Sequence, residues 1–136
     1  MTLRADPDRG QVTAMWAILS LALLVLAGLI YDGGQILTAR REANNLARQA
    51  ARAGAQTLDE TASRIGTLTL DPDAAEAAAL DYLARRHATG TAIADPTQLT
   101  VTVTIVQPTP LLALAGIDQR VVTGTATAQP TQGPIP

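Results

Sequence analysis

Cysteine is absent from this chain of 136 residues. Its absence excludes disulfide bridges, thiolate metal sites and cysteine nucleophiles, and it leaves the redox compartment unassigned. Phenylalanine and lysine are also missing, so the only aromatic residues are Trp16, Tyr31 and Tyr82, and all ten basic residues are arginine. A core of alanine, leucine, valine and isoleucine buries little area per residue. The soluble part of the chain is therefore expected to benefit from a partner.

Neither the net charge nor its distribution favours nucleic acid as a partner. The formal net charge is -2, which gives no general attraction to a polyanion. A nucleic-acid-binding face normally combines basic and aromatic residues, but the main arginine cluster lies on a segment without aromatics. That cluster consists of Arg40, Arg41, Arg48 and Arg52.

Catalytic and metal-binding patterns are missing as well. His87 is the single histidine, and no serine or carboxylate constellation is recognisable beside it, which favours a surface or helix-end role. The two Asp-Pro-Asp triplets, residues 6–8 and 71–73, lack the further oxygen ligands and the glycine spacing of a calcium loop. We therefore expect no enzyme activity, no catalytic residues, no metal, no cofactor and no small-molecule substrate.

A long apolar run is the strongest feature that is present. No residue between Gly10 and Tyr31 is charged, and residues 12–30 are interrupted only by the weakly polar Thr13 and Ser20. As a helix this run is about 28 Å long, close to the thickness of the hydrocarbon core of a bilayer. A cleaved signal peptide would have a shorter apolar region and a nearby Ala-x-Ala site. The sequence thus predicts a retained transmembrane helix over residues 11–31.

The flanking charges do not fix the orientation of this helix. Arg4 and Arg9 precede it in the company of Asp6 and Asp8, while an arginine pair follows it at positions 40 and 41. The positive-inside rule therefore does not decide which end of the helix faces the cytoplasm. Residues 1–10 are expected to be a leader or a short cytoplasmic segment.

A stripe of small and apolar residues continues from the membrane segment into the soluble part. Counted as heptads, its positions form one seam on the helix, and small side chains permit close approach of another element. Two partners are compatible with this seam, the protein's own sheet and the helix of another subunit. The seam consists of Gly28, Asp32, Ile36, Ala39, Ala43, Leu46, Ala50 and Ala53.

The segment Asp32-Gly33-Gly34 marks the predicted exit from the membrane. Each glycine costs a helix about 1 kcal/mol relative to alanine, which predicts a bend or a melted turn at Gly33 and Gly34. Asp32 lies on the seam beside this weak point. Two interpretations remain open for Asp32: it pairs with an arginine of a neighbouring chain, or it marks the boundary of the hydrocarbon.

The remainder predicts a second helix and a small antiparallel sheet. For the helix, Asp73 and Glu76 suggest a capping box, Asp81 and Arg85 an ion pair, and Gly90 the residue after its end. Alternation of apolar residues with threonine predicts strands over residues 98–106 and 120–128, joined through a short apolar element at 111–116. Residues 67–70 could add an edge strand. The predicted fold is α+β, with a long N-terminal helix, a two- to three-stranded sheet, a pilin-like domain over residues 32–128 and a tail over 129–136.

These parts together resemble TadE/TadG-like proteins of tight-adherence (Tad/Flp) pilus systems, a branch of the type IV pilus and type II secretion machinery. The N-terminal features that carry the resemblance are Arg9-Gly10, the apolar span, Asp32-Gly33-Gly34, Arg40-Arg41 and the alanine-rich continuation to Ala55. The C-terminal part is similar through a strand, a Pro-apolar-Gly element at 110–116 and a Val/Thr/Ala strand ending at Ala128.

The resemblance implies a minor pilin or pseudopilin-like structural subunit that aids filament initiation or assembly. Such a subunit is anchored by a single pass in the cytoplasmic membrane, with its C-terminal domain outside, and can enter a cell-surface filament. The implied partners are other pilin-like subunits, the inner-membrane assembly platform, membrane lipid and a prepilin peptidase. The alternative is a membrane-anchored extracytoplasmic binding or accessory module that is not incorporated in a filament.

Processing by the peptidase would fall between Gly10 and Gln11. The fifth residue of the mature chain would then be Met15, whereas pilins commonly have a glutamate there. In pilins that carboxylate is thought to attract the N-terminal amine of the adjacent subunit within lipid. Its absence implies either a special position, such as a filament tip, or an anchored assembly factor that is never cleaved.

Overall fold

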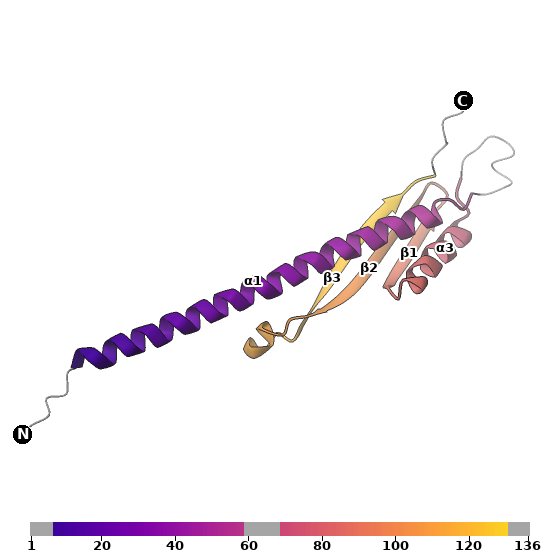
Figure 1. The fold of residues 1–136 in the computed structure, drawn as a ribbon. Helices are drawn as coiled ribbons and strands as arrows, with labels where there is room; N and C mark the ends of the chain where they lie inside the picture. The colour runs from indigo at the N-terminus through magenta and orange to yellow at the C-terminus, as the bar shows by residue number, and fades with distance from the viewer. Residues whose placement is uncertain (1–6, 59–68, 131–136) are drawn as a thin grey trace, which may run out of the picture.

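A single helix, α1 (Pro7–Gly54), extends through 48 residues and dominates the architecture in Figure 1. The computed structural model describes residues 7–58 and 69–130. Beyond α1 the described elements are α3 (Pro72–Arg85), the strands β1 (Thr89–Asp95), β2 (Gln98–Pro108) and β3 (Gln119–Ala128), and a short 3₁₀ helix, η1 (Leu112–Ala115). The C-terminal half of α1 lies on the sheet, whereas its N-terminal half projects away from it (Figure 1).

The three strands form an antiparallel sheet in the order β1-β2-β3. Helix α1 packs on β2 and β3, and α3 packs on β1 beside α1, so both helices cover the same face of the sheet. The α+β prediction is confirmed. Strand β1 was not assigned from sequence, although its Thr-Gly-Thr-Ala-Ile alternation is a strand signal. Of the suggested edge strand at 67–70, residues 67 and 68 lie outside the described residues, and Leu70 makes an isolated bridge to Leu58.

Helix α1 continues through Gly33 and Gly34 without interruption, so the predicted melted turn is wrong, whereas the alternative of a bend stays a prediction. Adding a residue to a formed helix is favourable once nucleation is complete, and helix on both sides of the glycines, packed on the sheet from Ala39 onward, outweighs their low propensity. The hydroxyl of Thr38 also donates to the carbonyl of Gly34 at 3.0 Å. A Cβ at either glycine would meet nothing within 4 Å, so no close contact requires glycine there.

The capping box predicted for α3 is wrong, because the helix begins earlier than the pattern indicated. Asp71, not Asp73, is the N-cap, and its carboxylate accepts from the backbone N–H of Ala74 at 3.1 Å. Pro72 explains the shift, because its fixed φ and missing N–H suit the first helical position. Glu76 instead accepts from the backbone N–H of Ala94 in β1 at 2.8 Å and ties the helix to the sheet.

Two further predictions for α3, its ion pair and the residue after its end, have different outcomes. The ion pair between Asp81 and Arg85 is confirmed. Gly90, however, lies within β1 and does not follow the helix end; His87, with φ of 55°, takes the left-handed position there. Gly90 is required by packing, since a Cβ would approach the carbonyl oxygen of Thr102 to 2.5 Å.

The core lies between the helix layer and the sheet. Its strand residues all come from one face of β2, while the helices contribute mostly alanine because the backbones approach closely. A Cβ at Gly124 of β3 would lie 2.3 Å from the backbone nitrogen of Asn44. The core comprises Ala43, Ala47, Ala50, Ala51, Leu70, Ala75, Ala79, Leu83, Leu99, Val101 and Val103. The opposite face of the sheet presents threonines, with hydroxyl contacts between Thr100 and Thr127 and between Thr102 and Thr125.

Candidate functional site

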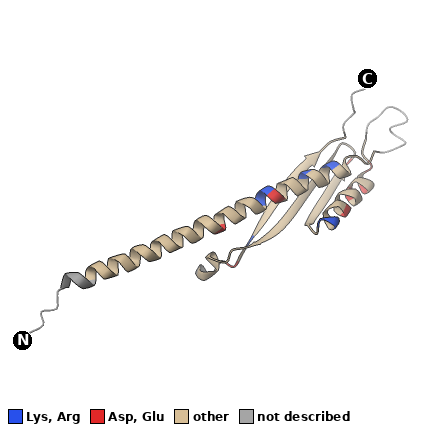
Figure 2. Ribbon diagram, in the orientation of Figure 1, with Lys and Arg blue, Asp and Glu red and all other residues tan. Residues whose placement is uncertain are grey.

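The N-terminal half of α1 is apolar and exposed on every side. From residue 11 to 31, Gly28 is the only buried position. Figure 2 shows no charged residue along this described stretch. The helix is long and apolar enough to cross a membrane, and a core helix of a soluble protein would instead be mostly covered. The coarse prediction of a candidate membrane span is therefore supported by both composition and exposure.

The C-terminal half of α1 uses the predicted seam to contact its own sheet. Ala39, Ala43 and Ala50 are buried, whereas Ile36, Leu46 and Ala53 are half-buried. The buried stripe continues through Ala47, Ala51 and Gly54, which the heptad count missed. A straight α helix has 3.6 residues per turn and drifts away from a strict 3.5-residue repeat. Of the two partners left open for the seam, the protein's own sheet is the one seen here.

Asp32, between the two halves, holds a segment of its own chain that is distant in sequence. Its Oδ2 accepts hydrogen bonds from the backbone N–H groups of Leu111, at 3.0 Å, and Leu112, at 2.6 Å. Asp32 is fully buried, and its Oδ1 has no hydrogen-bond partner among the described residues. Neither sequence interpretation anticipated this contact. The carboxylate binds the N-terminal end of η1 and thereby fixes the β2–β3 connection to α1.

The β2–β3 connection is closed at its base by Thr109. This buried residue donates from its hydroxyl to the carbonyl of Ile117 at 2.6 Å and from its N–H to the carbonyl of Asp118 at 3.0 Å. Gly116, with φ of 85°, ends η1 in the left-handed region. The sequence signalled an apolar turn through Pro110 and Gly116 but gave no sign of the role of Thr109.

The connection and α1 enclose an apolar groove of about 430 Å³. Gly28 allows this approach, because a Cβ there would lie 3.2 Å from the Cβ of Leu111. Among the residues that the structure describes, no polar side chain lines the groove. Its lining residues are Leu21, Leu24, Val25, Gly28, Leu111, Leu112 and Leu114.

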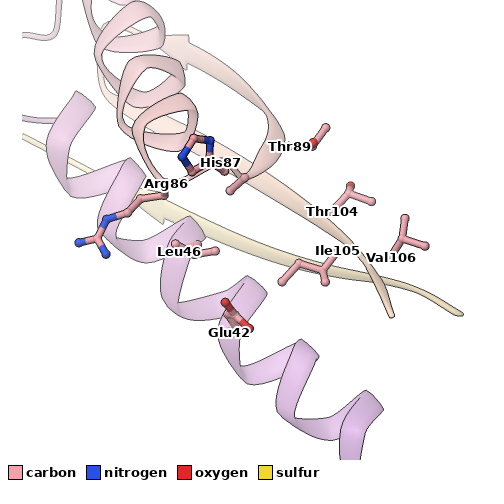
Figure 3. Close-up of a pocket in the computed structure, with 9 residues that line it drawn as sticks. Glu42, Leu46, Arg86, His87, Thr89, Thr104, Ile105 and Val106 are labelled. Atoms are coloured by element: carbon pink, nitrogen blue, oxygen red, sulfur yellow. The ribbon is translucent and has the colours of Figure 1, made fainter. Parts of the chain in front are cut away.

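A second cavity, of about 440 Å³, lies where α1, the end of α3 and the sheet meet. Figure 3 shows Glu42 and Leu46 on α1, with Arg86 and His87 at the end of α3. The guanidinium of Arg86 lies 5.6 Å from the centre of the Tyr82 ring. Within residues 7–58 and 69–130, no group of three or more His, Asp or Glu side chains could hold a metal ion.

The predicted processing site lies at the start of α1. Gly10 and Gln11 are both within the helical span, and Met15 is exposed on the next turn. No contact of the described residues bears on cleavage. Processing between Gly10 and Gln11 therefore stays a prediction.

These features define an α+β protein whose long N-terminal helix is exposed and apolar in its first half and packed on a small sheet in its second. Residues 10–57 match the Tad family model, described as Flp pilus-assembly TadE/G-like. The match confirms the resemblance for this segment, which contains nearly all of α1, and it ends before α3 and the sheet. Neither the curated proteins nor the solved structures yielded a match to the chain.

Proposed function

We propose that this protein is a structural, non-enzymatic subunit of a Tad/Flp-type pilus assembly system, a minor pilin or pseudopilin-like component. The observation that carries the proposal is the division of α1, because one half is suited to lipid and the other carries a folded domain. The segment that matches the Flp pilus-assembly model is the same helix. In this proposal α1 is a single-pass anchor in the cytoplasmic membrane, and the sheet domain lies outside.

Assembly in this proposal uses the surface of α1 that the sheet leaves free. The buried stripe is already occupied by the protein's own strands, so contacts between soluble parts of subunits must involve another face. The arginines of α1 lie on that exposed face, and they offer charge-assisted contacts to carboxylates of neighbouring subunits. They are Arg40, Arg41, Arg48 and Arg52. The remaining partners are the membrane-embedded helices of other pilin-like subunits and the inner-membrane assembly platform.

Replacement of Arg41 by glutamate tests this function without disturbing the core. A host strain that lacks the gene is complemented with the unchanged chain, with Arg41→Glu or with Thr125→Glu, and surface pili and recovery of assembly proteins are measured. Arg41 and Thr125 are both exposed, but Thr125 lies on the sheet face away from α1. We expect Arg41→Glu to lose piliation and Thr125→Glu to retain it. Normal piliation without the gene would contradict the proposed function.

The N-terminus of the membrane-extracted protein distinguishes the two versions of this role. A chain that starts at Gln11 is a peptidase substrate that can enter a filament, and Met15 then places it at a special position such as the tip. A chain that starts at Met1 or Thr2 is an anchored assembly factor. N-terminal sequencing separates these outcomes directly.

The second candidate function is a membrane-anchored binding or accessory module outside the filament. The cavity beside Glu42, Arg86 and His87 favours it, because charged and apolar residues of two helices and the sheet line it. Binding of a ligand to the purified full chain in detergent, without any pilus protein, and loss of that binding in Arg86→Ala would support this candidate.

A further inference from the structure

The β2–β3 connection presents its leucines outward. Leu114 is 90% exposed, Leu111 43% and Ile117 38%, although a loop at the end of a small sheet normally carries polar residues. These side chains contribute nothing to the core between the helices and the sheet. An apolar loop directed away from the core indicates a contact with another apolar medium.

The position of the loop along α1 indicates which medium this is. In Figure 1, the short helix between β2 and β3 lies beside the part of α1 that projects away from the sheet. The groove between them is lined on α1 by Leu21, Leu24, Val25 and Gly28, all within the apolar run 12–30. Leu21 lies about 14 Å deeper along the helix than Ile30. The loop therefore lies alongside the candidate membrane span and not beyond its end.

Non-helical backbone at such a depth must have its polar groups paired, because lipid offers no hydrogen bonds. Most N–H groups of the connection have such a partner. Asp32 accepts from Leu111 and Leu112, and Thr109 closes the base. Four further amides donate to carbonyls of the same loop: Ala113 to Thr109 at 2.9 Å, Leu114 to Leu111 at 3.4 Å, Gly116 to Ala113 at 3.0 Å and Ile117 to Leu112 at 3.1 Å.

A polar boundary follows the loop directly. Asp118, Gln119 and Arg120 come immediately after Ile117, and Arg120 lies opposite Gln107 in the register of β2 and β3. All three residues that follow the loop are exposed. On α1, Tyr31 lies next to Asp32 and is exposed, as is typical of an aromatic at the membrane interface. The change from apolar to polar side chains thus occurs near the same level on both elements.

We propose that η1 and its flanking leucines insert into the outer half of the bilayer, where lipid acyl chains cover the loop and fill its groove against α1. This inference rests on the proposed function, because it requires α1 to span the membrane. Lipid is favoured over a second protein chain because the described lining of the groove is entirely apolar, with no group to specify a partner, and is continuous with a helix surface that is apolar on every side. Asp32 then stabilises the insertion by pairing two amides of the loop at the edge of the hydrocarbon.

Spin labels at single cysteines test the insertion in the full chain, since the natural sequence has none to remove. Leu114→Cys, Leu24→Cys and Thr125→Cys are labelled with a nitroxide and reconstituted in phosphatidylethanolamine–phosphatidylglycerol vesicles. Collision rates with oxygen, which concentrates in lipid, and with a water-soluble nickel chelate are measured for each. We expect the oxygen-to-nickel ratio at Leu114 to approach that at Leu24 and to exceed that at Thr125 severalfold.

The controls separate failure of this inference from failure of the proposed function. If the oxygen-to-nickel ratio at position 114 resembles that at 125 while the ratio at 24 indicates lipid, the insertion of the loop is contradicted but the membrane anchor is not. If position 114 is shielded from both reagents while 24 remains accessible to oxygen, a protein chain covers the loop and the lipid contact is likewise overturned. If position 24 itself is aqueous, the membrane anchor fails, and the insertion fails with it.

Discussion

The two halves of α1 contain many of the same residue types but serve different surroundings. Residues 12–30 expose large leucine, isoleucine and valine side chains on every side, whereas residues 39–54 bury a narrow stripe of alanine and glycine against β2 and β3. Large side chains maximise contact with lipid, and small ones allow two backbones to approach. The difference shows that the seam seen in the sequence is not one interface but two environments joined end to end.

Asp32 marks the point where the two environments meet. It is the first charged residue after the apolar run, and it is buried by the loop that it binds. A carboxylate in this position would disrupt a purely lipid-facing helix, because burial without partners is costly. Hydrogen bonds from two amides give one of its two oxygens, Oδ2, partners within its own chain.

Filling the closest backbone approach in the packed half should have the largest effect. In Gly124→Val, the new Cβ would collide with the backbone of Ala43 and Asn44, which cannot rotate away. We expect a loss of unfolding free energy of about 3 kcal/mol. Urea unfolding of the detergent-solubilised chain measures this. The matched glycine variant Gly34→Ala meets nothing within 4 Å and should stabilise the helix by up to about 1 kcal/mol.

Removal of the carboxylate at the junction should have the next largest effect. Asp32→Leu leaves the amides of Leu111 and Leu112 without their acceptor, which we expect to cost about 2 to 3 kcal/mol. Hydrogen exchange of these two amides should accelerate strongly, while exchange in β2 changes little. Asp118→Ala, at an exposed carboxylate in the same connection, should leave their exchange rates close to those of the unchanged chain.

A pair of alanine-to-leucine variants tests which positions of α1 form the buried stripe in the packed half. Ala47 is completely buried although the heptad count omitted it, whereas Ala53 belongs to the predicted seam but is only half-buried. We expect Ala47→Leu to cost about 2 kcal/mol and Ala53→Leu less than about 1 kcal/mol. A larger cost for Ala53→Leu than for Ala47→Leu in thermal or urea unfolding would mean that the buried stripe follows the heptad and not the straight helix.

The smallest effect concerns the β1–β2 turn, far from the junction. Hydrogen bonds from the side chain and backbone of Thr97, with a further one from the backbone of Gln98, hold the pKa of Asp95 below its ordinary value. A carboxyl group with a lowered pKa in the folded state stabilises the protein above its unfolded pKa, and this contribution disappears as the pH falls through the folded pKa. Asp95→Asn should therefore weaken the acid sensitivity of stability below about pH 4.

The elements with a strong periodic pattern could be predicted from the sequence. The apolar run, the second helix and two alternating strands all have strong local patterns, and the structure contains each of them. Strand β1 was missed because its small residues give a weak hydrophobic signal. The turn expected at Gly33 and Gly34 failed because intrinsic propensity is outweighed by the helix on both sides and by packing.

The site at the junction was only partly accessible from sequence. Asp32 was identified as unusual, but its partners are backbone amides 79 and 80 residues away, and backbone groups leave no sequence signature. The role of Thr109 was missed for the same reason, since Thr109 donates hydrogen bonds to the backbone carbonyls of Ile117 and Asp118 across the loop. Close approaches such as Gly124 to Asn44 also depend on tertiary geometry that no local pattern contains.

A cysteine scan of α1 tests the central comparison most directly. Single cysteines are placed along positions 12–54 of the full chain in membranes, and their reaction with a membrane-impermeant maleimide is measured. The two environments predict uniform protection over residues 12–30 and, from residue 35 onward, protection that recurs every 3.6 residues at positions such as 39, 43, 47 and 50. Periodic reactivity within 12–30, or uniform protection from 35 to 53, would contradict the division of α1 into a lipid-facing half and a half packed on its own sheet.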